Sequence, residues 1–205
     1  MKIAIIGSGN LGGTLASKWA QKEHQVILGV RDINQFKGQE LLHLPNIIAA
    51  SITEAVKQAE VILLATPAIN TIDVVQSLGD TTGKVIIDSM NIIMNRGPQG
   101  FTNTTDAILT HTQTRDVVKC FNTTGFNNMQ NPAYASMSLD LFVAGDSEKG
   151  KNIAIQLALD AGFSDCYAIG GNDKFALMEQ FAWFWINLAM FQGQGRDIGF
   201  KLLKR

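Results

Sequence analysis

The sequence predicts an α/β protein with a doubly wound, mainly parallel sheet and a small helical extension at the C-terminus. Apolar, β-branched runs alternate with helical patterns from Lys2 to about residue 170. Several runs are continuously hydrophobic, as expected of parallel strands that helices cover on both faces. No Pro-rich or charged linker interrupts the alternation. We therefore expect one sheet domain over residues 1–170 and an extension over residues 171–205.

The order of the expected elements follows from hydrophobic periodicity. The expected strands are Lys2 to Ile6, Gln25 to Gly29, Ile47 to Ala50, Val61 to Ala65, Val85 to Asp88, Val117 to Phe121, Leu139 to Ala144 and Tyr167 to Ile169. Between the first two, Leu11, Leu15 and Trp19 recur at four-residue spacing, which predicts a helix from Asn10 to Gln21. Thr53 is expected to cap a short helix. Further helices are expected near Asn70 to Leu78, Thr104 to Thr110 and Glu148 to Ala161.

The segment from Asp173 to Phe191 is apolar on nearly every face. A helix of this kind must be covered on all sides. Since a sheet covers one side only, a second protomer, a cofactor ring or the tail from Gly193 to Arg205 must supply the rest. We expect a core helix or a homodimer helix, and the alternative is a helix that also contacts a ligand.

Composition excludes several classes of partner. The chain of 205 residues has 17 basic and 18 acidic side chains and a net charge of -1, which gives no electrostatic footprint for nucleic acid or an anionic membrane. The histidines are scattered, with no metal-binding spacing, and His111 is expected at the surface. Cys120 and Cys166 are expected to be buried thiols of a cytoplasmic protein. The hydrophobic run from Phe181 to Phe191 is too short to span a bilayer. The N-terminus does not resemble a signal peptide.

The first expected strand ends in a glycine-rich motif. Gly7, Ser8, Gly9, Asn10, Leu11 and Gly12 form a GxGxxG pattern between a strand and a helix, the setting in which this pattern indicates dinucleotide binding. Gly7 would permit the tight turn, Gly9 would let a pyrophosphate approach the main chain, and Gly12 would let the helix pack on the strand. The amides of the helix start would then hold the phosphates. The pattern predicts a Rossmann-type domain over residues 1–170, and an ordinary Gly-rich turn is the alternative.

The end of the second strand bears on the choice of cofactor. An NAD enzyme usually places Asp or Glu there to bind the ribose 2′-hydroxyl. Here the strand runs through Gly29 and Val30 to Arg31, which could meet a 2′-phosphate. The sequence therefore favours NADP(H) over NAD(H). Two alternatives stay open: a solvated Arg31 beside a helix-capping Asp32, or Asp32 turned toward a ribose.

Three further strand ends should lie at the same edge of the sheet. Ala65, Thr66, Pro67 and Ala68 follow the fourth strand and should border the nicotinamide and its ribose, since ligands of doubly wound sheets lie outside the carboxyl ends of the strands. Asn91 and Asn122 lie in small polar clusters after the next two strands. Either could hydrogen-bond a carboxamide or a ribose, and simple turn chemistry explains the clusters equally well.

No catalytic residue is assigned from the sequence. No nucleophile has a paired base, and no Lys, His or Asp has a spacing that indicates proton transfer. Hydride transfer between two cofactor rings needs little acid or base from the protein, because its main requirement is two rings held face to face in a dry pocket. A dehydrogenase of an alcohol would usually need a general base.

Three stretches together resemble the NADPH-dependent coenzyme F420 reductases and related bacterial dinucleotide-binding oxidoreductases. They are Ile3 to Gly12 with Gly29 to Arg31, the strand Val117 to Asn122, and the tail Gly195 to Leu203. The first two also resemble the cytoplasmic reductase domain of STEAP metalloreductases.

The resemblance implies a Rossmann domain with NADP(H) on the loop and a deazaflavin (F420) or a flavin as the second ring. It implies pyrophosphate contacts from Gly7 to Leu11, the 2′-phosphate at Arg31 and the nicotinamide beside Thr66 to Ala68. The family often has Ser where this chain has Val30, which removes one phosphate ligand. Two other hypotheses are a non-catalytic NADP(H)-sensing module and a small-molecule dehydrogenase of the imine or β-hydroxyacid reductase type. Members of the latter group usually carry a large helical C-terminal domain.

Overall fold

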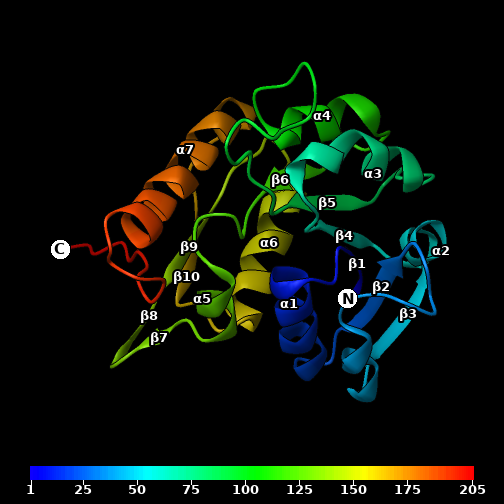
Figure 1. The fold of residues 1–205 in the computed structure, drawn as a ribbon, viewed down its shortest axis with the longest axis horizontal. Helices are drawn as coiled ribbons and strands as arrows, with labels where there is room; N and C mark the ends of the chain where they lie inside the picture. The colour runs from blue at the N-terminus through cyan, green and yellow to red at the C-terminus, as the bar shows by residue number, and fades with distance from the viewer.

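A six-stranded parallel sheet forms the centre of the computed structural model, which describes residues 1–205 (Figure 1). The strand order is β3-β2-β1-β4-β5-β6. The bounds are Lys2–Ile6 for β1, Gln25–Val30 for β2, Ile47–Ser51 for β3, Val61–Leu64 for β4, Val85–Asp88 for β5 and Val117–Lys119 for β6. The order reverses between β1 and β4, so the topological switch point lies where the glycine-rich loop leaves β1. The predicted doubly wound α/β fold is confirmed.

Helices cover both faces of this sheet, and each face has its own hydrophobic core. On one face lie α1 (Asn10–Gln21) and α6 (Glu148–Asp160), which contribute Trp19 and Leu157 to the larger core. On the other lie α2 (Ile52–Gln58), α3 (Thr71–Ser77) and α4 (Thr104–His111). The strands β1, β2, β4, β5 and β6 are almost entirely buried on both sides, which explains why they are nearly continuous apolar runs in the sequence, whereas the edge strand β3 exposes Ile48.

The last two expected strands do not extend the six-stranded sheet. β9 (Asp140–Val143) and β10 (Asp165–Ala168) form a separate parallel pair, and an antiparallel bridge between Lys119 and Ala144 joins this pair to β6. The expected sixth strand is also shorter than predicted. Phe121 has a φ of 63°, which turns the chain away from the sheet, so the strand ends at Lys119.

Several short elements were not expected from the sequence. They are the helix α5 (Phe126–Gln130), the hairpin of β7 (Ala133–Tyr134) and β8 (Met137–Ser138), and the 3-10 turns η1 (Gln39–His43), η2 (Ala68–Asn70) and η3 (Asn172–Lys174). The expected cap of α2 was wrong. Ser51, not Thr53, caps that helix, because Ser51 lies in extended conformation before the first turn and accepts a hydrogen bond from the amide of Glu54.

The C-terminal part consists of α7 (Phe175–Ile186), which continues as the π-helical η4 (Asn187–Phe191), and an extended tail. The tail folds back over α7: the indole of Trp185 donates a hydrogen bond to the carbonyl of Ile198, and the rings of Phe181 and Phe200 lie 4.6 Å apart. The tail therefore covers part of the apolar surface of α7, which is one of the three possibilities expected from the sequence. Leu177 and Phe184 nevertheless stay about half exposed. None of the helices combines the length and apolar character needed to cross a bilayer.

The two cysteines are buried thiols, as predicted. Cys120 follows β6, Cys166 lies in β10, and their sulfur atoms are 3.8 Å apart. His111 is exposed at the end of α4, also as predicted.

Candidate functional site

The three glycines of the loop after β1 meet three different surroundings. Gly7 has a φ of 104°, and a Cβ there would lie 2.4 Å from the carbonyl oxygen of Ala65. A Cβ on Gly12 would lie 2.0 Å from the carbonyl oxygen of Gly7, so α1 packs tightly on its own loop. A Cβ on Gly9 would meet nothing within 4 Å. The first and third glycines are required by the fold, and the second faces open space, as the dinucleotide interpretation of the motif predicts.

The start of α1 also has free hydrogen-bond donors. Gly9 is the N-cap residue and no side chain caps the helix, so the amides of the first turn lack intrahelical partners. Ser8 donates a hydrogen bond to the carbonyl of Lys37, which ties the loop to the segment after β2. An uncapped helix start beside an open glycine is a suitable surface for a phosphate.

The end of β2 lies beside this loop. Ile6 of β1 pairs with Gly29 of β2, so Val30 is the last residue of the strand and Arg31 leaves the sheet beside the glycine loop. Val30 is buried in the core, which leaves only its main chain at the edge. The guanidinium of Arg31 is exposed and makes no hydrogen bond or ion pair. Its position and its free donors suit an anionic ligand.

Asp32 is engaged in a turn. One oxygen of its carboxylate accepts a hydrogen bond from the amide of Asn34 at 2.9 Å. The residue caps a turn here and no helix follows directly. The expectation that Asp32 caps a helix was therefore wrong, because its side chain closes a turn through Asn34.

The end of β4 contacts the glycine loop directly. Ala65 packs against Gly7 through its carbonyl, and Thr66 donates a hydrogen bond to the sulfur of Met90 at 3.3 Å. Pro67 is exposed, whereas Ala68 is buried at the start of η2. These residues therefore lie between the loop and the end of β5.

Asn91 and Asn122 bind each other at the ends of β5 and β6. The amide of Asn91 donates to the carbonyl of Asn122 at 2.8 Å, and the amide of Asn122 donates to the side-chain oxygen of Asn91 at 2.9 Å. Asn122 also donates to the carbonyl of Met178 in α7 at 3.1 Å. Asn122 is buried, and its side-chain oxygen has no hydrogen-bond partner. Because an unpaired buried acceptor is costly, this atom fits a donor on a ligand.

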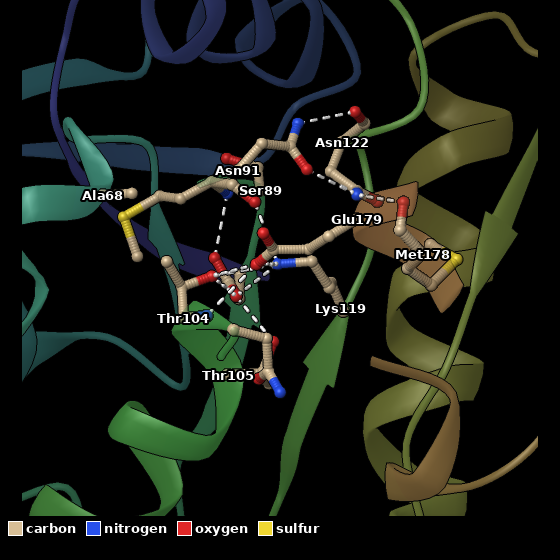
Figure 2. A network of polar contacts seen from close by, with 12 residues as sticks. Ala68, Ser89, Asn91, Thr104, Thr105, Lys119, Asn122, Met178 and Glu179 are labelled. Carbon is tan, nitrogen blue, oxygen red and sulfur yellow. Dashed lines mark hydrogen bonds and ion pairs between the residues drawn. The ribbon is translucent and has the colours of Figure 1, made fainter. Parts of the chain in front are cut away.

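A buried charged network lies beneath these asparagines (Figure 2). The ammonium of Lys119 contacts the carboxylate of Asp88 at 2.9 Å and that of Glu179 at 3.1 Å. It also donates to the carbonyl of Met90 and the hydroxyl of Thr104, each at 2.9 Å. Asp88 in turn accepts hydrogen bonds from the hydroxyls of Thr104 and Thr105. The network joins β5, β6, α4 and α7.

Sequence reasoning missed this network, although a signal for it exists. Lys119 is the charged residue in an apolar strand, and Glu179 is the charged residue in the apolar helix α7. A buried Lys must be paired, so its position in a strand predicted to be covered on both faces indicates a carboxylate partner. The lysine side chain is completely buried and faces carboxylates, so it holds the structure and is not a group that a substrate can reach.

Two cavities flank the candidate site. The larger, of about 860 Å³, borders Ser8, Gly9 and Asn10 and extends along the solvent side of α1. The second, of about 530 Å³, lies between the ends of β5 and β6 and the helix α7. Its lining is mainly apolar and consists of Asn91, Ile93, Met94, Asn122, Thr124, Ala182, Trp183, Trp185, Ile186, Met190, Phe191 and Arg196.

The structure brings the predicted residues to one edge of the sheet but not into one cavity. The glycine loop borders the larger cavity, and the two asparagines border the second. Neither cavity is lined by Val30, Arg31 or Ala65 to Ala68. The carboxyl ends of β1, β2, β4, β5 and β6 nevertheless form a continuous edge between them.

The fold and the glycine-rich loop after β1 are together typical of Rossmann-type dinucleotide-binding proteins. Residues 2–92 match the family model described as NADP oxidoreductase, coenzyme F420-dependent. This match confirms, over those residues, the resemblance drawn from the sequence. The match covers less than half of the 205-residue chain and supports a dinucleotide-dependent reductase.

Solved structures share the fold. A protein from Arthrobacter sp. FB24, provisionally named an F420-dependent NADP-reductase, is 24% identical, with full coverage of both chains and a TM-score of 0.84. A hypothetical protein from Sinorhizobium meliloti is 22% identical, with a TM-score of 0.72 over 100% of this chain and 96% of its own. A reductive aminase from Aspergillus terreus, solved with NADPH and ethyl levulinate, is 16% identical, with a TM-score of 0.69 over 94% of this chain. The present chain covers 62% of that longer one.

Proposed function

We propose that the chain is an NADP(H)-dependent oxidoreductase that transfers a hydride between nicotinamide and a deazaflavin (F420) or flavin-like acceptor. The observation that carries the proposal is the contrast among the loop glycines, in which Gly7 and Gly12 are enclosed and Gly9 faces open space. The residues fit a dinucleotide because this loop, the uncapped start of α1 and the unpaired oxygen of Asn122 offer groups for its two ends. A nicotinamide held there would give or accept the hydride at its C4 atom.

The proposed pyrophosphate site is the glycine loop. Main-chain amides of Gly9 to Gly12 would bind the phosphates, helped by the dipole of α1. Ser8, Asn10 and Leu11 would line the same site. The helix dipole and the free amides supply partial positive charge without a metal ligand.

The proposed 2′-phosphate site is Arg31, with Val30 contributing its main chain only. The free guanidinium at the end of β2 and the engagement of Asp32 with Asn34 both favour NADP(H) over NAD(H). A charge-assisted contact between Arg31 and the phosphate is worth about 1.5 to 3 kcal/mol.

The proposed nicotinamide end lies over the ends of β4, β5 and β6. Ala65 to Ala68 would border the ring and its ribose, and Asn91 and Asn122 would orient the ring. The unpaired oxygen of Asn122 would accept a hydrogen bond from the carboxamide or from a ribose hydroxyl.

The proposed acceptor site is the cavity against α7. Its apolar lining would exclude water from a flat ring beside the nicotinamide. At its rim, the guanidinium of Arg196 lies 5.2 Å from the ring centre of Phe126 and 5.8 Å from that of Trp185. On this proposal residues 1–170 bind the dinucleotide, and residues 171–205 complete the acceptor pocket.

The test combines binding and turnover. NADPH and NADH are titrated into wild type and Arg31→Ala, and NADPH absorbance is followed with deazaflavin, FMN, FAD, quinones and ferric chelates as acceptors. We expect NADPH to bind wild type more tightly than NADH, and Arg31→Ala to lose about 10- to 100-fold in NADPH affinity. Equal binding of both cofactors by wild type would remove the NADP(H) assignment.

An imine reductase activity is the second candidate, because imine reductases and reductive aminases share the fold over 94% of this chain. Those chains are longer, and this chain covers 64% of the Streptomyces aurantiacus imine reductase. Turnover of cyclic imines with NADPH, in the absence of turnover with deazaflavin or flavins, would favour this candidate.

A further inference from the structure

Two consecutive residues of α7 hold the ends of both β5 and β6. The carbonyl of Met178 accepts a hydrogen bond from the side chain of Asn122, which is bound to Asn91 in turn. The carboxylate of the next residue, Glu179, accepts a hydrogen bond from the amide of Ile92 at 2.8 Å. The C-terminal helix therefore fixes both asparagines of the site through one short stretch (Figure 2).

The second oxygen of Glu179 reaches the far end of the loop that follows Ile92. It accepts a hydrogen bond from the amide of Thr104, the first residue of α4, at 3.1 Å. One carboxylate thus holds both ends of the segment 93–103. That segment places Ile93 and Met94 on the wall of the cavity against α7.

The surroundings of Glu179 fix its geometry. The residue is 6% exposed, and its charge is balanced by the ammonium of Lys119 at 3.1 Å and by the start of α4. Removing the carboxylate would leave the amides of Ile92 and Thr104 without their acceptor. A buried donor without a partner favours a local rearrangement, and because Ile92 directly follows Asn91 in the chain, a shift of its amide would also displace Asn91.

We propose that Glu179 is a positioning residue for the nicotinamide end of the site. This inference rests on the proposed function. Glu179 would act through the main chain of Ile92 and Thr104, setting the position of Asn91 and of the pocket wall, without touching the dinucleotide. The helix that helps form the acceptor pocket would thereby also determine how tightly the nicotinamide half is bound.

The test separates the two halves of the dinucleotide. The dissociation constants of NADPH and of 2′,5′-ADP, which lacks the nicotinamide half, are measured by calorimetry for wild type and variants. The dissociation constant of 2′,5′-ADP divided by that of NADPH is the ratio that reports the contribution of the nicotinamide half. Glu179→Asp keeps the charge opposite Lys119 but is too short to hold both amides. We expect this ratio to fall about tenfold, with the affinity for 2′,5′-ADP unchanged.

Matched variants distinguish positioning from general destabilisation. Gln180→Ala, at the exposed neighbouring position of α7, should leave both affinities unchanged. Glu179→Gln, which keeps the length and one acceptor oxygen, should restore part of the ratio relative to Glu179→Asp. A folded Glu179→Asp protein with the wild-type ratio, or one that loses both affinities alike, overturns the inference.

A measurement on wild type does not depend on the folding of any variant. In hydrogen exchange, NADPH should slow exchange of the amides over residues 91–104, and 2′,5′-ADP should not. Equal protection by both ligands, or by neither, contradicts the positioning role. If wild type binds neither ligand, the proposed function itself fails, an outcome distinct from an unchanged ratio in Glu179→Asp.

Discussion

The ammonium group of Lys119 lies 2.9 Å from the carboxylate of Asp88, and neither side chain is exposed to solvent. The two residues are register partners at the ends of neighbouring parallel strands. Their pairing fixes the edge of the sheet where the asparagines of the candidate site lie. A buried ion pair need not stabilise a fold relative to apolar residues, but loss of one partner is costly because the other charge stays buried and unpaired.

We therefore expect Lys119→Met to lower the free energy of unfolding by about 3 to 5 kcal/mol, since Asp88 and Glu179 would both lose their cation. Urea denaturation followed by circular dichroism measures the change. The control is Lys149→Met, which breaks a partly exposed ion pair with Asp116 and should cost at most about 1 kcal/mol. Equal losses in the two variants would mean that the buried network contributes no more than a surface pair.

The loop glycines predict opposite outcomes for two similar substitutions. Gly12→Ala places a methyl group 2.0 Å from the carbonyl oxygen of Gly7, so it should destabilise the fold by about 1 to 3 kcal/mol. Gly9→Ala adds a methyl group in open space at a φ of -73°, so the fold should tolerate it. If that space receives the pyrophosphate, Gly9→Ala should instead weaken NADPH binding, on the order of tenfold or more.

Thermal unfolding and NADPH titration of both variants provide the measurement. We expect Gly12→Ala to lose thermal stability and Gly9→Ala to lose affinity for NADPH. A Gly9→Ala protein that binds NADPH as wild type does would show that the open space at Gly9 is not the phosphate site.

The hydrophobic pattern of the sequence was sufficient to predict most of the sheet and its helices. The helix from Asn10 to Gln21 has the predicted bounds, and the strands of the six-stranded sheet lie where continuous apolar runs indicated them. Such runs carry their own signal, because a strand covered on both faces must be apolar throughout. The short α5 and the hairpin from Ala133 to Ser138 carry no comparable signal, since they are too short to show a period.

The site was predictable where a motif is local in sequence and where the topology of a parallel sheet brings strand ends to one edge. Spacing alone indicated the loop from Gly7 to Gly12, because strand, turn and helix are consecutive. The network of Asp88, Lys119 and Glu179 joins three segments that are far apart in the chain, and only tertiary packing brings them together. The same reason explains why the separate pair of β9 and β10 was not predicted, because its partners, from Asp140 with Asp165 to Val143 with Ala168, lie far apart in the chain.

The apolar surface of the C-terminal helix supports the prediction of a homodimer through residues 175–191. Leu177, Phe184, Met190 and Phe191 are each at least half exposed even with the tail in place. Exposed apolar patches of this kind mark interaction surfaces. Wild type should therefore be dimeric in light scattering at high micromolar concentration, and Phe184→Glu should shift it to a monomer. A monomeric wild type at that concentration would contradict the prediction.

Burial makes Cys120 an unreactive thiol. Loss of hydration raises the pKa of Cys120 well above its ordinary value of 9.0, and its contact with the thiol of Cys166 acts in the same direction. Because the thiolate is the reactive form, iodoacetamide should not modify Cys120 in the native protein at pH 8 and should modify it in guanidinium chloride. Mass spectrometry of tryptic peptides measures the difference. Rapid modification of the native protein would show that the strand end opens readily.

The same shift predicts how stability depends on pH. In the unfolded chain the Cys120 thiol ionises near pH 9.0, whereas in the folded protein it stays protonated to higher pH. Its contribution to stability is therefore complete below pH 9 and falls as the pH rises from there toward the folded pKa. The pKa values of Tyr134 and Tyr167 are also raised, from ordinary values of 10.0, so the decline that starts near pH 9 comes before most of theirs. Cys120→Ala should flatten this early decline, and a decline as steep as in wild type would assign it to another group.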